Sequence, residues 1–307
     1  MPTKKLNHLK QHEIDIDKWN YCIGNASNSR VYATSWYLDR TAEFWEALVW
    51  EDYGYVMPLP VGKKWGIKYI YQPYFCQQLG IFPSPPVDIQ RKFADELIKK
   101  YNYLEFQVNP QTIPEAFTSF EAGNRVNYVL PLHDPYATLT AQFKSNARNH
   151  ISNSYKKGLR IVNTLDSMKY VELKRQHTEK SVDSRSFKIL TKLISWSLSN
   201  SIGQIIAAIS PQNEICGAAF FLKYGTRLIY LNSFSTPEGR KYKAMYAILN
   251  EVIKRYAGSG LLFDFEGSSV ESIATFFRSF NPAEEQFHSL YLNNLPFPLK
   301  YFKRKKT

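Results

Sequence analysis

The feature that most constrains this chain is an order of expected elements that occurs twice along it. In the second half, residues 203–210, 215–224 and 227–234 predict three strands, joined by the turns PQNE and GT. From Arg240 to Tyr256 apolar residues recur every three or four positions, which predicts a helix. The run LLFDFE at 261–266 predicts a further strand. The order is therefore strand, strand, strand, helix, strand.

The first half follows the same order. Three strands are predicted at 45–52, 55–61 and 67–73, followed by a helix from Asp88 to Tyr101 and a strand at 103–109. In that last strand, the triplet LEF matches FDF of the second half. Two similar halves are predicted. Each would be a mixed, mostly antiparallel sheet flanked by helices, so the expected fold class is α/β (α+β).

Three segments carry a resemblance to a known family. They are YVMPLPVGKKWGIKYIYQPYFCQQLGIF at 55–82, FKSNARNHISNSYKKGLRI at 143–161 and FDFEGSSVESIATFFRSF at 263–280. Through them the chain resembles the FemAB-like branch of the GNAT (Gcn5-related N-acetyltransferase) superfamily, whose members contain two tandem GNAT-type domains. In that superfamily an amine commonly attacks an activated acyl group. FemAB-type members take aminoacyl groups from aminoacyl-tRNA and add them to peptidoglycan precursors.

The length and the resemblance together give an expected division of the chain. Its 307 residues suit two domains. We expect an N-terminal GNAT-like domain at 1–142 and a C-terminal one at 143–307. The second would begin with a basic linker helix at 143–160 and end in a basic tail at 300–307.

Composition limits the class of protein further. With 44% hydrophobic and 15% aromatic residues, the chain is expected to bury a substantial core. No apolar run approaches the length of a transmembrane helix, and the N-terminus lacks the apolar core of a secretory signal. Cys22, Cys76 and Cys216 are odd in number and far apart, which suits free thiols in the cytoplasm.

The net charge of +12 is compatible with nucleic acid, an anionic membrane face or a phosphorylated substrate. No RNP, zinc-finger or helix-turn-helix signature supports a direct nucleic-acid function. The resemblance implies tRNA as a possible partner by another route, as carrier of the acyl donor.

Asp264 and Glu266 are the first candidate site residues. Side chains two apart in a strand share a face, so both are expected to point to one side. A carboxylate near an amine acceptor can take its proton during attack. The alternative is a structural strand-to-helix corner, in which Ser268 and Glu271 form a capping box. A metal site is not predicted, because no further ligand cluster lies nearby.

A basic cluster at the start of the long helix is the second candidate. In many GNAT proteins, the pyrophosphate of coenzyme A rests on a glycine-rich loop at this place. Here Lys243 and Met245 stand where the resemblance expects glycines, and side chains there hinder close backbone approach. Arg240, Lys241 and Lys243 can still bind a phosphate; the alternative is a solvent-facing basic helix start.

Three further residues complete the candidate set. Lys144 and Arg148 share a helical face and either bind a substrate anion or belong to a solvated linker helix. Tyr230 is a candidate acid for the leaving group, because a tyrosine has this role in many GNAT enzymes. Tyr242 is an equal alternative on sequence grounds.

The sequence thus predicts an enzyme of the cytoplasm that transfers an acyl or aminoacyl group to a small-molecule or peptide amine. No cofactor is assigned; acyl-CoA or aminoacyl-tRNA is the expected donor. The alternative is a non-catalytic binding protein on a degenerate double-GNAT scaffold, favoured by the altered glycine loop.

Overall fold

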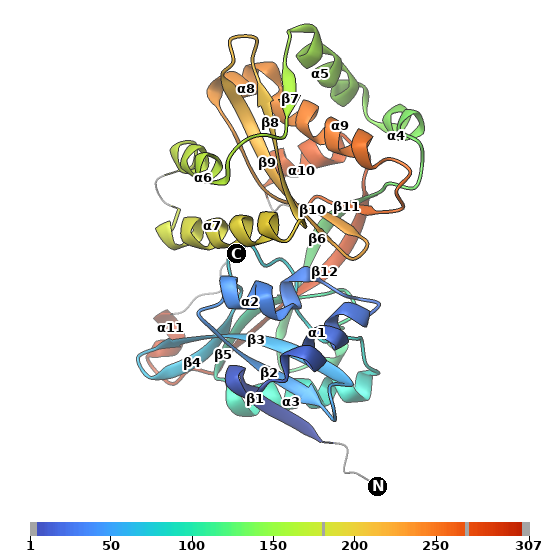
Figure 1. Cartoon of the computed structure of the whole chain (residues 1–307). Helices are drawn as coiled ribbons and strands as arrows, with labels where there is room; N and C mark the ends of the chain where they lie inside the picture. Colours follow the sequence, from blue (N-terminus) through green and yellow to red (C-terminus); the bar gives the residue numbers. More distant parts are fainter. Residues whose placement is uncertain (1–4, 180–181, 268–269, 303–307) are drawn as a thin grey trace. The chain divides into compact units, whose positions relative to one another are not determined.

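The structure of the protein is a computed structural model that describes residues 5–179, 182–267 and 270–302 (Figure 1). It separates into two compact units. The first comprises Met1–Arg125 and Gln286–Thr307, and the second Val126–Glu285. Each unit is built on strands with helices on both faces, so the predicted α/β class with mixed sheets is confirmed.

The first unit contains strands in the order β1-β2-β3-β4-β5-β12. Their bounds are β1 (Leu6–Lys10), β2 (Phe44–Trp50), β3 (Tyr55–Lys64), β4 (Ile67–Tyr71), β5 (Tyr103–Val108) and β12 (Ala283–Asn293). Its helices are α1 (Ile16–Asn25), α2 (Ser35–Thr41), α3 (Val87–Lys100) and α11 (Leu299–Phe302), with short 3-10 turns at Gln11–Glu13, Val31–Ala33 and Pro114–Ala116. Strand β1 pairs antiparallel with β2.

The helices of the first unit lie on opposite faces of this sheet. On one face Trp45 of β2 packs against Trp19 of α1, with ring centroids 5.1 Å apart. On the other, Lys92 of α3 lies over the ring of Trp50. Because Trp45 and Trp50 are an odd number of positions apart in one strand, they point to opposite faces.

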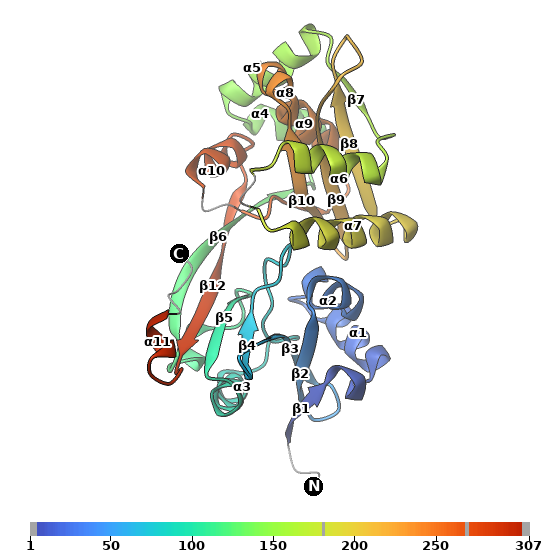
Figure 2. The ribbon, with the colours of Figure 1, turned by 90° about the vertical axis from the view of Figure 1, so that its left-hand side faces the viewer.

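The second unit contains strands in the order β6-β11-β10-β9-β8-β7. Their bounds are β6 (Glu121–Pro131), β7 (Arg160–Val162), β8 (Gly203–Ile209), β9 (Ile215–Tyr224), β10 (Arg227–Ser235) and β11 (Leu262–Asp264). Its helices are α4 (Tyr136–Gln142), α5 (Ser145–Lys156), α6 (Ser167–Gln176), α7 (Ser184–Ser199), α8 (Pro237–Tyr242), α9 (Ala244–Tyr256) and α10 (Glu271–Arg278). Helices α6 and α7 cover one face of the sheet, and α4, α5 and α9 lie on the other (Figures 1 and 2).

Both units contain the predicted order of elements. Strands β2, β3 and β4 form an antiparallel meander, α3 follows, and β5 returns parallel to β4. Strands β8, β9 and β10 likewise precede α8 and α9, after which β11 returns parallel to β10. A helix between two parallel neighbouring strands is what a crossover requires.

The two units exchange the greater part of one strand each, because residues 126–131 of β6 belong to the second unit and residues 286–293 of β12 belong to the first. Strand β6 follows β5 in the chain but pairs with β11 of the second unit, whereas β12 follows β11 but pairs with β5. The compact units therefore differ from the expected division at 142/143. Residues 126–142 lie in the second unit, and 286–302 lie in the first. The expected linker helix is α5, an internal helix of the second unit. Of the expected basic tail, 303–307 lie outside the described residues.

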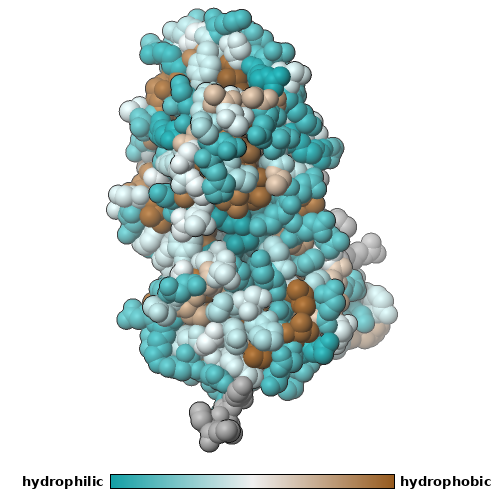
Figure 3. Space-filling view, turned by 90° about the vertical axis from the view of Figure 1, so that its right-hand side faces the viewer, coloured by the Kyte–Doolittle hydropathy of each residue, from teal (hydrophilic) through white to brown (hydrophobic). Residues whose placement is uncertain are grey.

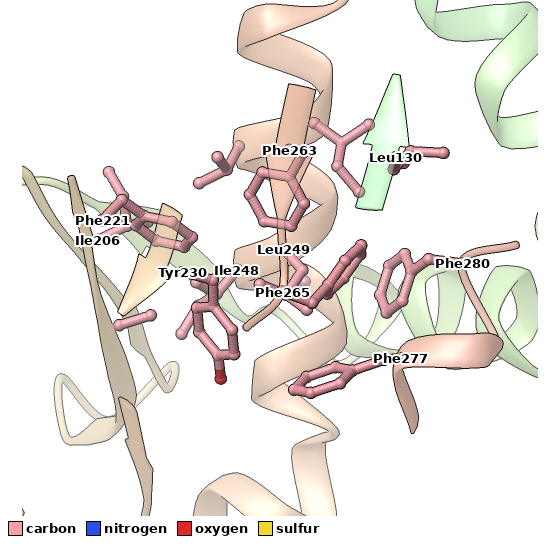
Figure 4. Packing of buried hydrophobic residues seen from close by; sticks show 14 of the residues in the cluster. Leu130, Ile206, Phe221, Tyr230, Ile248, Leu249, Phe263, Phe265, Phe277 and Phe280 are labelled. Atoms are coloured by element: carbon pink, nitrogen blue, oxygen red, sulfur yellow. The ribbon is translucent and has the colours of Figure 1, made fainter. Parts of the chain in front are cut away.

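The second unit buries a core rich in aromatic rings on the α9 face of its sheet. Phe263 and Phe265 are buried beside Phe277 and Phe280, and Ile248 and Leu249 of α9 pack onto them (Figure 4). The rings of Phe263 and Phe265 meet edge to face at 4.6 Å. Aromatic pairs of this geometry each contribute roughly 0.5–1.5 kcal/mol beyond their buried area.

On the surface view, hydrophobic residues form small groups among hydrophilic ones on the face shown (Figure 3). Within the described residues, no helix is long and apolar enough to span a membrane.

Candidate functional site

A cavity of about 590 Å³ opens in the second unit where two parallel strands separate. Strands β10 and β11 pair only from Arg227 to Ile229 and from Leu262 to Asp264. Beyond that point β10 continues to Ser235, while the segment that follows β11 turns away at Glu266 and Gly267, whose φ angles are 62° and 61°. Ligands bind preferentially in crevices beyond the carboxyl ends of parallel strands.

Gly267 explains why the chain can turn so tightly. A Cβ atom at this position would lie 2.2 Å from the carbonyl oxygen of Val126. The positive φ and this close approach together require glycine. Glu266, the residue before this turn, is part of the cavity lining.

Polar and charged side chains gather on the lining. They are Lys174, Tyr230, Asn232, Ser233, Ser235, Arg240, Lys243, Glu266 and Ser272. The apolar remainder comprises Leu231, Met245, Tyr246, Phe265, Ile273, Phe276 and Phe277, with Gly239 and Gly267. A mostly apolar cavity of this size with a few convergent polar groups is typical of a small-ligand site.

Strand β10 contains a bulge at the cavity. Its register with β9 shifts between Tyr230 and Asn232, which leaves Leu231 as the additional residue. A bulge changes the direction of the side chains that follow it. Beyond the bulge, the carbonyl oxygen of Ser233 accepts a hydrogen bond from Lys174 Nζ at 2.7 Å, and that of Ser235 accepts one from Arg240 at 3.2 Å.

The structure brings four of the predicted site residues together. Glu266, Tyr230, Arg240 and Lys243 all line the cavity. The Tyr230 hydroxyl points away from the packed Phe263 and Phe265 rings, and it donates to Ser233 Oγ at 2.5 Å (Figure 4). Burial raises the pKa of Tyr230 to about 12, so its proton is retained at neutral pH.

Asp264 lies outside the cavity lining. The sequence predicts that it shares a face with Glu266, and the structure does not show this. The Asp264 carboxylate is 2% exposed and forms an ion pair with Arg227 at 2.6 Å. It also accepts hydrogen bonds from Asn127 and from the backbone N–H of Glu266, both at 2.9 Å. The expectation fails because β11 ends at Asp264, so strand alternation no longer applies to Glu266.

Arg227 joins this carboxylate to a second one. Its guanidinium also contacts Glu285 at 2.6 Å. Burial alone would lower the pKa of Arg227, but the charges of Asp264 and Glu285 raise it above its ordinary value. The group is a buried ion-pair network beneath the cavity corner, and neither Asp264 nor Arg227 lines the cavity.

Three other predicted residues also lie outside the lining. Lys241 is exposed and pairs with Glu238 on α8 at 2.8 Å. Arg148 donates to the carbonyl oxygens of Ala141 and Phe143, at the C-terminal end of α4. Lys144 is exposed at the N-cap of α5.

The helix after the corner begins at Glu271, with Val270 at its N-cap. Ser268, the predicted capping residue, lies outside the described residues. The carboxylate of Glu271 contacts Arg278 of the same helix. Within the part of the chain that the structure describes, no group of three His, Cys, Asp or Glu side chains could hold a metal ion.

The expected single helix from Arg240 is divided. Helix α8 ends and α9 begins at Lys243, whose φ of 56° is left-handed. Gly239 allows α8 to pack against β9, since a Cβ atom there would lie 1.7 Å from the Cys216 carbonyl oxygen. The residues in the place of the expected glycine loop, Lys243 and Met245, present side chains to the cavity. Side chains thus stand where the resemblance expects the glycines of a pyrophosphate-binding loop, and Arg240 and Lys243 contribute positive charge to the same lining.

Lys174 is the functional candidate that sequence reasoning misses. It lies on α6, and only its position in the fold distinguishes it from the other lysines of that helix. Burial lowers its pKa below the ordinary lysine value. A perturbed lysine in a cavity is a typical property of functional sites.

Comparison with solved structures identifies the fold. The chain superposes on FemX with a TM-score of 0.68 at 11% identity, covering 95% of this chain and 99% of FemX. A conserved protein of unknown function from Bacteroides thetaiotaomicron gives 0.62 at 11% identity, with coverages of 91% and 96%. The C-terminal domain of a protein assigned as a lysylphosphatidylglycerol synthetase from Agrobacterium fabrum gives 0.56 at 8% identity, with 94% of each chain covered.

The protein thus shares the fold of FemX, in agreement with the fold that the sequence resemblance implies. No protein-family model matches the sequence, and no curated protein matches it.

Proposed function

We propose that this protein is an acyltransferase or aminoacyltransferase that transfers an activated acyl group to an amine acceptor. The observation that carries the proposal is the cavity at the divergence of β10 and β11, which places Glu266 and Tyr230 on one lining. The fold shared with FemX supports the same reaction class.

Each group has a role in the transfer. The acceptor nitrogen attacks the carbonyl carbon of the acyl donor, and the Glu266 carboxylate accepts the proton that the nitrogen releases. When the tetrahedral intermediate collapses, the bond to the leaving oxygen or sulfur breaks. Tyr230 keeps its hydroxyl proton at neutral pH, and it donates this hydroxyl proton to the leaving group directly or through the Ser233 hydroxyl.

The donor is expected to be aminoacyl-tRNA or acyl-CoA, and the acceptor a small-molecule or peptide amine. Arg240 and Lys243 supply positive charge for a donor phosphate. Because Lys243 and Met245 present side chains where a backbone cradle is expected, the lining favours a donor that is held by side chains. Both donors are made in the cytoplasm, so the proposal places the reaction there.

The test is a transfer assay with labelled acyl groups, run over panels of aminoacyl-tRNA and acyl-CoA donors and of amine acceptors. With the active pair, Glu266→Gln is expected to lower kcat about 100- to 10,000-fold while the fold is kept, because a general base is lost. The matched control is Glu238→Gln, which alters an exposed carboxylate outside the cavity. Turnover of Glu266→Gln equal to the wild type would refute the assigned base.

A non-catalytic binding protein is the second candidate, because the two expected loop glycines are replaced. It predicts a different result in the same panel. Donors or acceptors would stabilise the protein against heat, yet no labelled product would form with any pair. Glu266→Gln would then change affinity alone.

A further inference from the structure

One end of the cavity presents hydrogen-bond donors almost exclusively. Lys174 reaches it from α6, and its ammonium uses one of three N–H groups on the Ser233 carbonyl oxygen at 2.7 Å. Two N–H groups therefore remain for a ligand. The neighbouring side chains of Asn232 and Ser233 belong to the same lining.

The hydrogen bonds behind the lining fix the polarity of both neighbours. The Tyr170 hydroxyl donates to Asn232 Oδ1 at 2.9 Å, so the amide Nδ2 is left to donate. The Tyr230 hydroxyl donates to Ser233 Oγ, which leaves the serine hydroxyl proton to be donated in turn. Among the described residues, nothing accepts a hydrogen bond from Asn232 Nδ2 or from the Ser233 hydroxyl.

Among the described residues, no carboxylate neutralises the charge of Lys174. The lysine is partly buried. Burial accordingly lowers its pKa, with no neighbouring charge opposing the effect. A desolvated ammonium of this kind is stabilised by an anion at its free N–H groups.

Arg240 lies along the same edge of β10. Its guanidinium is bonded to the Ser235 carbonyl oxygen, two residues after the one that Lys174 uses. Lys243 lines the cavity as well. Three cations thus face a single lining carboxylate, Glu266, so the cavity favours a ligand with negative charge.

We propose that the Lys174 end of the cavity is an oxyanion-binding subsite, in which Lys174 and Asn232, both on the α6 side of β10, together bind a carboxylate or phosphate group of a substrate. That the ligand is a substrate rests on the proposed function, whereas the subsite itself does not. The subsite would select acyl donors or acceptors that carry such a group beside the reacting atoms.

The experiment measures binding of small probes to the whole protein, without donor, acceptor or turnover. Isothermal titration is made with inorganic phosphate, with succinate and with neutral succinamide. We expect phosphate or succinate to bind with a dissociation constant of ~1 mM, as suits a fragment, and succinamide to bind far more weakly. Whichever anion binds more tightly identifies a phosphate or a carboxylate as the group recognised.

Lys174→Met keeps an unbranched side chain that is one atom shorter and removes its charge. It is expected to weaken binding of the preferred anion by about tenfold or more, and Asn232→Ala by a smaller factor. Lys169→Met is the matched control on the same helix, where the lysine is half exposed and pairs with Glu172. This control should bind as the wild type does.

A labelling experiment on the wild type covers the case in which Lys174→Met does not fold. Acetic anhydride is applied at pH 8, and acetylation is read by mass spectrometry. The preferred anion should protect Lys174 but not Lys169. Equal binding by wild type and Lys174→Met, no binding of either anion, or no protection of Lys174 would each overturn the subsite. A failed transfer assay would leave these measurements unaffected.

Discussion

Two carboxylates only two residues apart have different environments in this protein. Asp264 closes a buried network with Arg227, while Glu266 lines the cavity. The difference arises because β11 ends at Asp264 and the backbone of Glu266 is left-handed, so the alternation of strand side chains does not continue to Glu266. The proposed chemistry is therefore assigned to Glu266, which lines the cavity, whereas Asp264 takes part in the ion-pair network.

Replacing Asp264 tests this distinction. Asp264→Asn preserves shape but removes one of two carboxylates from a buried arginine. Removing one partner of a buried ion pair costs roughly 3–5 kcal/mol, and because Glu285 remains, we expect about 3 kcal/mol. Urea unfolding measures the loss, with Glu285→Gln as a milder comparison at the more exposed partner. A midpoint equal to that of the wild type would show that the network contributes nothing.

The buried Glu46 of β2 gives a prediction for pH. Its carboxylate bonds His8 Nε2 at 2.7 Å, Lys68 Nζ at 2.6 Å and the Tyr101 hydroxyl at 2.5 Å. Burial alone would raise the pKa of Glu46, but these three partners lower it from 4.5 to about 2. A carboxylate with a lowered pKa stabilises the fold above its unfolded pKa, and that contribution disappears as the pH falls toward 2.

We therefore expect Glu46→Gln to lose on the order of 3 kcal/mol at pH 6. The difference in free energy of unfolding between variant and wild type should decrease steadily from pH 5 to pH 2.5. Denaturant unfolding at each pH measures it. Glu96→Gln is the control, because that carboxylate makes only long contacts with Lys99 and Lys100 on the surface of α3. If the free-energy difference for Glu46→Gln stayed constant with pH, the lowered pKa of Glu46 would be contradicted.

At the scale of the element, helices and strands with a strongly periodic sequence could be predicted. Features that depend on contacts between distant elements could not. The helix predicted from Asp88 to Tyr101 is α3, and the strand predicted at 215–224 is β9. Local periodicity specifies such elements because each buries one face. The break at Lys243 was missed, since it depends on the approach of α8 to the distant Cys216. Lys174 was missed for the same reason: its role is defined by what surrounds it.

Gly239 allows the approach of α8 to β9, which predicts a strong effect of a single methyl group. Gly239→Ala places a carbon 1.7 Å from a backbone oxygen, so α8 must shift as a whole. We expect a loss of about 3 kcal/mol. Gly24→Ala is the control, because nothing lies within 4 Å of the added carbon in α1. It should stabilise the protein by about 0.5–1 kcal/mol. Thermal unfolding distinguishes the two, and equal effects would contradict the packing argument.

At the scale of the whole molecule, the repeat was predictable but the strand exchange was not. Each half could be recognised from its order of elements. The partners of β6 and β12 could not, because pairing across more than a hundred residues leaves no local pattern. As a result, the first unit depends on a strand that the sequence places after the second.

This dependence predicts which amides respond to a mutation in β12. Leu290 is fully buried opposite Phe106 of β5, so Leu290→Ala should destabilise the first unit by about 2–5 kcal/mol. Hydrogen exchange should then accelerate in β2, β3 and β5, while β8 and β9 keep their protection, because the second unit has its own core. Ile248→Ala, in the fully buried face of α9, is the converse experiment. It should accelerate hydrogen exchange in β8 and β9 alone. Leu290→Ala could instead accelerate hydrogen exchange in β8 and β9 as much as in β2 and β3. In that case the chain would unfold as one cooperative body, and the exchanged strands would couple its two cores.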